Sequence, residues 1–403
     1  MTGLQPSSYI VAGARTPIGK LAGGLSSFSA AEIGGKAIKA ALDKAGVAPD
    51  QVDFVFMGHV LQAGAGQITA RQAAEAAGIP MTVPSTTINK VCLSGLNAIQ
   101  LANLMIMSGQ ADIVVAGGME SMTNAPYLLP GARSGYRAGD ATLVDSMMYD
   151  GLFCAFDACS MGEGTERYLA AGSDAAITGV DRAAQDAFSA RSHERAVAAQ
   201  KEGRFDDEIV AVEVPQRKSD PVLFEVDEGV RPGTTSDSLG TLRPAFSESG
   251  GITAGNASQI SDGASATVIM SRAKAEELGV TPTGEFVSYG EVAGTPSLLT
   301  KPAEAARQAL DRAGMSVGDV GLFEINEAFA AVVLASSADL GVSDDIVNVN
   351  GGGVAMGHPI GASGNRIALT LLHEMQRRGD EYGIAALCGG GGQGDALLVK
   401  AVK

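Results

Sequence analysis

The chain is poor in several residue types, and each shortage excludes some classes of protein. Its 403 residues include no tryptophan, 4 cysteines and 4 histidines. Four cysteines are too few for a disulfide framework at this length and favour a reducing compartment. No apolar run approaches the roughly 20 residues that span a bilayer, and the first residues lack the basic and apolar regions of a secretory signal. We therefore expect a cytoplasmic protein that does not bind membranes.

Basic residues are also scarce. Lys and Arg number 29 against 45 Asp and Glu, which gives a net charge of -16. Nucleic acids and anionic membranes are bound through a basic surface, so this balance favours a small-molecule role. Hydrophobic residues make up 45% and charged residues 18% of the chain. A globular protein of two or three domains with a sizeable core is expected, which excludes wholesale disorder.

Glycine is the residue in excess, with 53 of 403 positions, nearly twice the usual share of about 7%. No G-x-y period is present, which excludes collagen. Six glycines fall within residues 351–364, and a second run occupies residues 389–394. Neither segment has the spacing of a P-loop or of a dinucleotide-binding loop. Because glycine lets a ligand approach the backbone closely, we expect both segments to contact a ligand.

Parts of the chain repeat each other. Residues 38–58 match residues 306–326 through the shared pattern Ala-Leu-Asp-basic-Ala-Gly, and residues 91–118 parallel residues 360–389. The first pair predicts a helix followed by a strand, and the second pair predicts a turn, a helix and a buried strand that ends in glycine. We therefore expect an α/β fold of two similar halves related by a pseudo-twofold axis.

The repeat is interrupted in the middle of the chain. Residues 121–250 carry 12 Lys and Arg against 21 Asp and Glu, several turn signals and one plausible amphipathic helix at 182–200. We interpret this segment as an inserted loop domain. Residues 251–275 are strand-like again and are expected to return to the first sheet. The predicted organisation is a first half of residues 1–120 plus 251–275, the insertion at 121–250, and a second half at 276–403.

Cys92 follows the turn Asn89-Lys90-Val91 and precedes an apolar helix. Unpaired N–H groups and the dipole at a helix N-terminus favour an anion and lower a thiol's pKa below about 8.5. The repeat places the glycine-rich turn around His358 opposite Cys92, which predicts a Cys–His pair. A buried structural cysteine and a glycine-rich turn with an incidental histidine remain alternatives.

Cys388 and Asn326 stand at the ends of predicted strands of the second half. Cys388 leads into the loop 389–394, whose N–H groups can serve as oxyanion donors, although a core role is an alternative. Asn326 is equally consistent with capping the helix that follows.

The other cysteines and histidines carry weaker signals. Cys154 and Cys159 are five residues apart in a stretch without histidine, which is a poor pattern for metal ligands, and their role is open. We expect no metal site. His193 and His373 are interpreted as surface residues of helices, and His59 as a residue at a strand end.

Four motifs together resemble the thiolase family. They are NKVCLSG at 89–95, NEAF at 326–329, GHPIGASG at 357–364 and CGGGGQG at 388–394, in the family's order. The resemblance runs from residue 11 to the C-terminus. It implies a five-layer α-β-α-β-α fold of two βαβαβαββ halves with an inserted loop domain. It also implies reversible condensation of two acetyl-CoA to acetoacetyl-CoA and CoA, no cofactor beyond CoA as substrate and product, and a homotetramer built as a dimer of dimers.

The resemblance also implies a role for each site residue. Cys92 is the acylated nucleophile, His358 accepts its proton, and Cys388 is the acid or base for the acetyl-CoA α-proton or the CoA thiol. His358 and a water held by Asn326 form one oxyanion hole, while the N–H groups of Cys92 and Gly390 form the other. Residues that match the family's CoA contacts and acyl tunnel are Ser258, Met161, Phe246, Ala254 and Phe329, with Arg231 for the nucleotide phosphates.

One departure leaves the substrate open. Ser160 stands where many short-chain thiolases have a histidine before the tunnel methionine. The alternatives are a 3-ketoacyl-CoA thiolase of broader chain length in fatty-acid β-oxidation, a decarboxylating ketosynthase, and a non-catalytic acyl-CoA binder. Ketosynthases usually have histidine where Cys388 stands. Retention of both cysteines, His358 and Asn326 argues against a silent binder.

Overall fold

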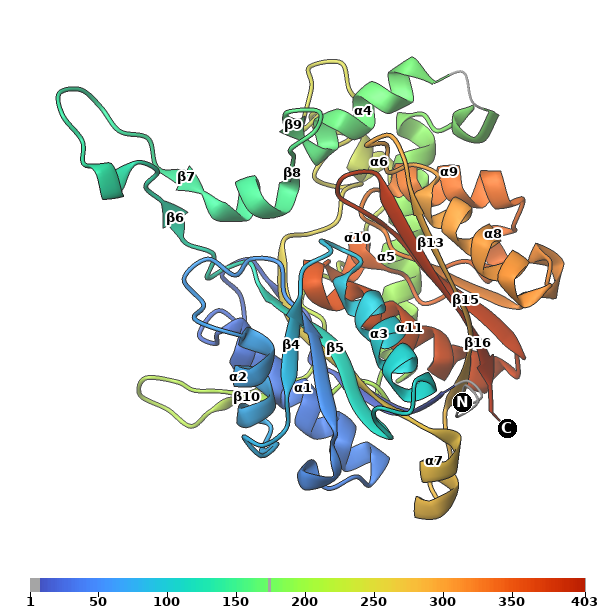
Figure 1. Ribbon diagram of the computed structural model, residues 1–403. Coiled ribbons are helices and arrows are strands. Elements are labelled where there is room, and N and C mark those ends of the chain that lie inside the picture. Colours follow the sequence, from blue (N-terminus) through green and yellow to red (C-terminus); the bar gives the residue numbers. More distant parts are fainter. Residues whose placement is uncertain (1–7, 173–174, 403) are drawn as a thin grey trace.

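The computed structural model describes residues 8–172 and 175–402, and its centre is one mixed sheet of ten strands (Figure 1). The strand order is β14-β15-β16-β13-β1-β12-β5-β3-β4, with the short β2 paired to β12. Among the described residues, the strands of the two halves pair where β1 meets β13, through Tyr9 with Glu285 and Ile10 with Gly284. Each half therefore has its own sheet, joined to the other at this short contact.

The bounds of the elements follow the two halves and the insertion. The first half contains β1 (Tyr9–Arg15), β2 (Gly19–Lys20), α1 (Ala30–Ala45), β3 (Phe54–Gly58), α2 (Thr69–Ala76), β4 (Ser85–Ile88), α3 (Ser94–Met107), β5 (Ile113–Ser121), β12 (Ser261–Met270) and α7 (Arg272–Leu278). The second half contains β13 (Gly284–Ala293), α8 (Lys301–Ala313), β14 (Leu322–Ile325), α9 (Ala330–Leu340), α10 (Gly353–Met356), α11 (Ile360–Arg378), β15 (Tyr382–Gly389) and β16 (Gln393–Ala401).

The predicted repeat is visible in how its helices end. Helix α1 stops at Gly46 with φ of 65°, and α8 stops at Gly314 with φ of 67°. Both glycines adopt the left-handed conformation that commonly closes a helix. Each helix then leads through a single 3-10 turn into a short buried strand, β3 or β14. The same local signals thus produce the same helix–strand unit in each half.

Helices and sheets alternate in five layers, as expected. Helix α1 packs on the outer face of the first sheet, against β1, β5 and β12, and α8 packs on β13, β15 and β16. Helices α3 and α11 lie between the sheets and contact both (Figure 1). Strands β5 and β12 are buried along their whole length, because helices cover both faces.

The two central helices approach each other through glycine. A Cβ at Gly95 would lie 2.8 Å from Asn365 N, and one at Gly364 would lie 2.4 Å from Leu96 N. Only residues without a side chain permit this distance between helix backbones. The crossing brings the first turn of α11 next to the first turn of α3, which is where the site is built.

The insertion lies beside and above the sheets, and one of its loops extends far from the body (Figure 1). Its elements are β6 (Tyr127–Leu128), β7 (Val144–Asp145), a π-helical turn (Met147–Leu152), β8 (Phe153–Cys154), β9 (Cys159–Ser160), α4 (Met161–Ala171), α5 (Arg182–Lys201), β10 (Val212–Val214), β11 (Val222–Phe224) and α6 (Ser236–Gly240). Helix α5 covers the predicted helix at 182–200. Within the described ranges, no helix has the length and apolar character needed to cross a bilayer.

Candidate active site

Cys92 is held by a tight turn between β4 and α3. Val91 has a φ of 50°, an unusual value for a β-branched residue. The Ser94 hydroxyl closes the turn, because it accepts the N–H of Lys90 at 2.8 Å and donates to Val91 O at 2.6 Å. The Cys92 side chain is only 6% exposed. The thiol is therefore fixed in place and largely shielded from water.

The Cys92 thiol is harder to ionise than the sequence suggested. Burial raises its pKa to about 12, and the carboxylate of Glu120 adds to this effect. The N–H groups of Cys92 itself and of Gly390 act in the opposite direction, since they stabilise the thiolate. The expected lowering by the helix N-terminus is therefore wrong in its net sign, because loss of hydration outweighs the N–H donors. The thiol is neutral near pH 7 and needs a base.

His358 has the form such a base requires. The Ser363 hydroxyl donates to Pro359 O at 2.9 Å, so its oxygen accepts from His358 Nδ1 at 2.5 Å. This arrangement assigns the ring proton to Nδ1 and leaves Nε2 able to accept a proton. Burial lowers the pKa of His358 to about 3, and the positive charge of Arg366 contributes. The imidazole is therefore neutral near pH 7.

Asn326 lies directly beside this imidazole. Its Nδ2 is 3.4 Å from His358 Nε2, and its side chain is fully buried at the end of β14. Its Oδ1 is also buried and has no hydrogen-bond partner within the described part of the chain. A buried acceptor of this kind needs a donor, so the amide can hold a polar group next to Nε2.

Cys388 and Gly390 bring the second half to the Cys92 sulfur. Cys388 ends β15 and is 1% exposed. Burial raises the pKa of its thiol far above the usual value, and repulsion from Cys92 raises it further, so the two sulfurs are close enough to interact. Gly390 follows two residues later and directs its N–H at Cys92. The five predicted catalytic residues therefore come together from both halves.

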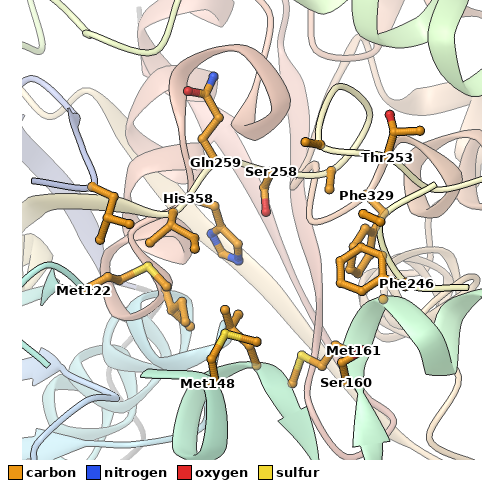
Figure 2. A pocket seen from close by; sticks show the side chains of 18 of the residues that line it. Met122, Met148, Ser160, Met161, Phe246, Thr253, Ser258, Gln259, Phe329 and His358 are labelled. Carbon is orange, nitrogen blue, oxygen red and sulfur yellow. The ribbon is translucent and has the colours of Figure 1, made fainter. Parts of the chain in front are cut away.

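A cavity of about 460 Å³ opens beside His358 (Figure 2). It lies between the insertion and the ends of both sheets. Figure 2 shows the Ser258 hydroxyl and the His358 ring pointing into the same space, with Met161, Phe246 and Phe329 across from them. All six predicted substrate contacts line it: Met161, Arg231, Phe246, Ala254, Ser258 and Phe329. A mainly apolar pocket with a few polar groups is typical of a small-molecule site.

The two thiols do not line this cavity. Cys92, Cys388 and Asn326 are not among its lining residues. A Cβ on Gly390 would lie 2.6 Å from the terminal methyl of Met161, so Met161 covers the N–H donor of the sulfur site. Met161 therefore lies between the cavity that it lines and the loop that directs an N–H at Cys92, and methionine is flexible enough to move aside.

The glycines of residues 351–364 serve a different purpose from the one expected. A Cβ at Gly352 would collide with the side chain of Glu327, one at Gly357 with Ser261, and one at Gly361 with Met119 O. None of the six glycines lines the cavity. They shape the turn around His358 by close packing within the protein, and they do not expose backbone to a ligand there.

The sequence analysis missed two residues that hold the site together. Gln259 donates through its amide to the carbonyls of Val354 and Ala355, at 3.0 and 2.8 Å. Glu120, at the end of β5, accepts the N–H of Gly361 at 2.9 Å. The available signals were a glutamine directly after Ser258 and an acid at the end of an otherwise apolar strand.

The interpretation of His193 as a surface residue is wrong. Its side chain is 3% exposed, and Nδ1 accepts the N–H of Arg231 at 3.2 Å. Burial lowers its pKa to about 4, with a contribution from Arg231. His193 thus fixes the backbone of a residue that lines the cavity. His373 is half-buried in α11, so it is not a plain surface residue either. His59 is buried just after β3, as placed from the sequence.

No group of three or more His, Cys, Asp or Glu side chains within the described residues could hold a metal ion. The described cysteines are all free thiols. The groups that the described chain supplies at this site are two thiols, a neutral imidazole, a carboxamide and backbone N–H donors.

The chain was compared with known families, proteins and structures. Residues 8–273 match the family model "Thiolase, N-terminal domain", and residues 280–401 match "Thiolase, C-terminal domain". A probable acetyl-CoA acetyltransferase of Mycolicibacterium smegmatis is 55% identical over 97% of this chain and 100% of that protein. The acetyl-CoA acetyltransferase of Cupriavidus necator is 53% identical over 97% of this chain and 98% of that protein. The crystal structure of the Bacillus anthracis acetyl-CoA acetyltransferase superposes with a TM-score of 0.95, at 39% identity and full coverage of both chains.

Proposed function

The chain belongs to the thiolase family, and on this basis we propose that it is an acetyl-CoA C-acetyltransferase. The reaction is the reversible condensation of two acetyl-CoA to acetoacetyl-CoA and CoA. The observation that carries the proposal is the meeting of Cys92, His358, Asn326 and Cys388 beside a cavity lined by every predicted substrate contact. Side chains of this site carry out each proton transfer of the proposed reaction.

In the first step, Cys92 attacks the thioester carbonyl of acetyl-CoA. His358 Nε2 takes the thiol proton and returns it to the departing CoA sulfur, leaving acetyl-Cys92. The neutral states of both groups favour proton transfer in concert with attack. The N–H groups of Cys92 and Gly390 are positioned to receive the developing oxyanion, and a donor of this kind is worth about 3–4 kcal/mol.

In the second step, the Cys388 thiol passes its proton to His358 Nε2, and the resulting thiolate removes an α-proton from a second acetyl-CoA. Because this carbon acid is much weaker than a thiol, the enolate oxygen needs donors; His358 and a water held by Asn326 are proposed to supply them. The enolate then attacks the carbonyl of acetyl-Cys92, which releases acetoacetyl-CoA and the Cys92 thiolate, and this thiolate takes the proton back from His358. Dividing the transfer between two steps gives ping-pong kinetics.

The cavity supports binding of CoA in an extended form. Ser258 presents a hydroxyl to the pantetheine arm, and Phe246 and Phe329 pack edge to face with ring centroids 6.1 Å apart. Lys20 and Arg231 supply positive charge among the lining residues. We propose that the nucleotide phosphates bind beside Arg231, where His193 holds the backbone.

Mass spectrometry after brief exposure to acetyl-CoA tests this proposal. We expect one acetyl group on Cys92, removed when free CoA is added. An acetyl group on another residue would refute the assigned nucleophile. Binding of CoA without acetylation or turnover would identify a non-catalytic acyl-CoA binder.

A more specific question is which length of acyl chain the enzyme accepts. Ser160 lines the cavity and gives more room than the histidine found in many short-chain members, which favours the 3-ketoacyl-CoA thiolase of broader chain length as the second candidate. Comparing turnover of acetoacetyl-CoA with that of a long 3-ketoacyl-CoA decides between them. A clear preference for the long substrate would overturn the acetyl-specific assignment.

We further propose a cytoplasmic homotetramer. The insertion exposes large apolar side chains on the segment 127–149, among them Tyr127 at 65%, Leu143 at 60% and Tyr149 at 60%. Exposed apolar patches of this kind mark contact surfaces. Light scattering coupled to gel filtration tests the assembly, and a monomer or dimer would refute it.

The division of the chain into 1–120 plus 251–275, 121–250 and 276–403 is also kept as a proposal. The pairing of β12 with β1 and β5 supports it. The boundary between the two matched family segments, after residue 273, supports it as well.

A further inference from the structure

Cys154 and Cys159 face each other across a small hairpin. Strands β8 and β9 run antiparallel, and Cys154 is the direct register partner of Cys159. Directly opposed residues in an antiparallel pair have Cα atoms about 4.5–5.5 Å apart. A disulfide needs Cα atoms about 4.4–6.8 Å apart. The two backbones are therefore already placed for a bond between these thiols.

The hairpin lies at the surface although its two thiols point inward. Cys154 is 7% and Cys159 is 4% exposed, while Phe156 at the tip is 75% exposed. The N–H of Asp157 donates to Cys154 Sγ at 3.4 Å, which keeps the loop folded over the sulfur. Each strand has only two residues. Elements this short open locally at low cost, which gives a small reagent access to either thiol.

The hairpin lies close to Met161, which lines the substrate cavity. Cys154 lines a small internal cavity together with Met161 and Gly390. Cys159 comes two residues before Met161, and Ser160 between them caps α4 by accepting the N–H of Glu163. A bond between the two thiols would fix the segment that positions Met161.

We propose that Cys154 and Cys159 form a reversible intramolecular disulfide by exchange with a low-molecular-weight disulfide such as glutathione disulfide. One cysteine thiolate attacks the external S–S bond, forms a mixed disulfide and releases one glutathione thiolate. The second cysteine thiolate attacks the mixed disulfide and releases the other. The two protons lost by the cysteines pass to the two leaving thiolates. The protein is oxidised by two electrons and the external disulfide is reduced by two.

The charges around the hairpin set the conditions for this exchange. Burial raises the pKa of the Cys159 thiol, Arg167 opposes this effect, and Glu163, Asp157 and Cys154 add to it. Only the thiolate attacks a disulfide. Exchange is therefore slow near pH 7 and is best measured at about pH 8.

The test uses the full-length folded protein incubated with glutathione disulfide at about pH 8 and then blocked with N-ethylmaleimide. Cleavage after Arg137 and Arg167 releases both cysteines on one peptide. We expect this peptide to be two hydrogen masses lighter and unlabelled, and dithiothreitol to restore two labels. The matched variants Cys154→Ser and Cys159→Ser should show only a free thiol or a glutathione adduct at the remaining cysteine.

Three outcomes would overturn the proposal. They are two labelled thiols at excess glutathione disulfide, a stable glutathione adduct without an internal bond, and a bond that joins Cys92 to Cys388 instead. A second readout is the midpoint of thermal unfolding. It should rise on oxidation of the wild-type protein and stay constant in Cys154→Ser, because the bond closes a loop without distorting the hairpin; a fall would show that the native geometry does not accept the bond.

Discussion

The two halves share one scaffold but end their strands differently. In the first half, β3 ends at Gly58, and β5 passes through Gly117 and Gly118. In the second half, β14 is followed by Asn326, and β15 ends with Cys388 and Gly389. Gly58 and Gly117 of the first half thus stand at the repeat positions that Asn326 and Cys388 occupy in the second.

These glycines of the first half receive the N-terminus of α11, the helix that follows His358. A Cβ at Gly118 would lie 1.8 Å from Gly361 O, and one at Gly58 would lie 2.6 Å from the same oxygen. The first turn of α11 is therefore seated directly on the first sheet. In the proposed mechanism, the two similar halves therefore have different roles: the first contributes the nucleophile and a docking surface, and the second contributes the acid–base groups.

The test with the largest expected effect removes the thiol of each half in a separate variant. In Cys92→Ser, we expect no acetyl-enzyme from acetyl-CoA and a loss of thiolysis of at least about 10⁴-fold, because the covalent step is gone. In Cys388→Ser, acetylation of Cys92 should persist while condensation and thiolysis fail. Quantitative mass spectrometry and steady-state rates separate the two. Equal loss of acetylation in both variants would break the comparison, and Cys154→Ser under reducing conditions serves as the active control.

The next test concerns the ionisation of Cys92. A pKa of about 12 against about 8.5 for an ordinary thiol lowers the thiolate fraction at pH 7.5 by roughly 10³. In His358→Gln, which lacks the base, alkylation of Cys92 by iodoacetamide should be slower than that of the unfolded chain by about this factor. Because the thiolate fraction grows with pH below the pKa, the rate should rise about tenfold per pH unit through pH 9. A plateau near pH 8 would contradict the burial argument.

Local pattern predicted the fold far better than it predicted the environment of the site. Each of these features has a signal within a short contiguous stretch of sequence: the units of the repeat, the helix at 182–200, and the motifs around Cys92 and His358. The direction of the Cys92 pKa shift could not be predicted in this way, because Cys92 is buried in a cluster that also contains Ile360 and Leu387, hundreds of residues away in the chain. His193 was misjudged for the same reason: its charged neighbours in sequence suggest a surface helix, whereas Arg231 contacts it from a distant loop.

The close packing of the first turn of α11 on the first sheet can be tested by adding one methyl group. In Gly118→Ala, the new Cβ would meet the backbone of Gly361, and neither strand nor helix can yield easily. Overpacking of this kind costs about 1–3 kcal/mol, and displacement of His358 by about 1 Å can lower the rate about 10²-fold. Gly240→Ala is the matched control, because a Cβ there meets nothing within 4 Å. Thermal unfolding and kcat are the measurements. Equal behaviour of both variants would show that the close approach is not needed.

The test with the smallest expected effect concerns Glu120, a carboxylate that joins the two halves where α11 packs on the first sheet. It accepts N–H groups from Val60 at 3.2 Å and Leu61 at 3.0 Å in the first half, and from Gly361 at 2.9 Å in the second. In Glu120→Gln, one amide group cannot accept all three bonds, so the turn that carries His358 should loosen. We expect kcat to fall about tenfold with KM unchanged, since a hydrogen bond to a charged group is worth about 1.5–3 kcal/mol. Glu381→Gln, a change at an exposed surface pair, is the control.

The pH profile distinguishes this positioning role from a general loss of stability. Burial raises the pKa of Glu120 to about 7, the N–H groups of Leu61, Gly361 and Val60 oppose this, and Asp262 adds to it. His59, 3.4 Å away, stays neutral because burial lowers its pKa to about 4. As the pH falls through 7, Glu120 gains a proton and loses acceptor capacity, so kcat of the wild-type enzyme should decline there. The variant cannot titrate and should lack this limb, and an unchanged limb in Glu120→Gln would assign it to another group.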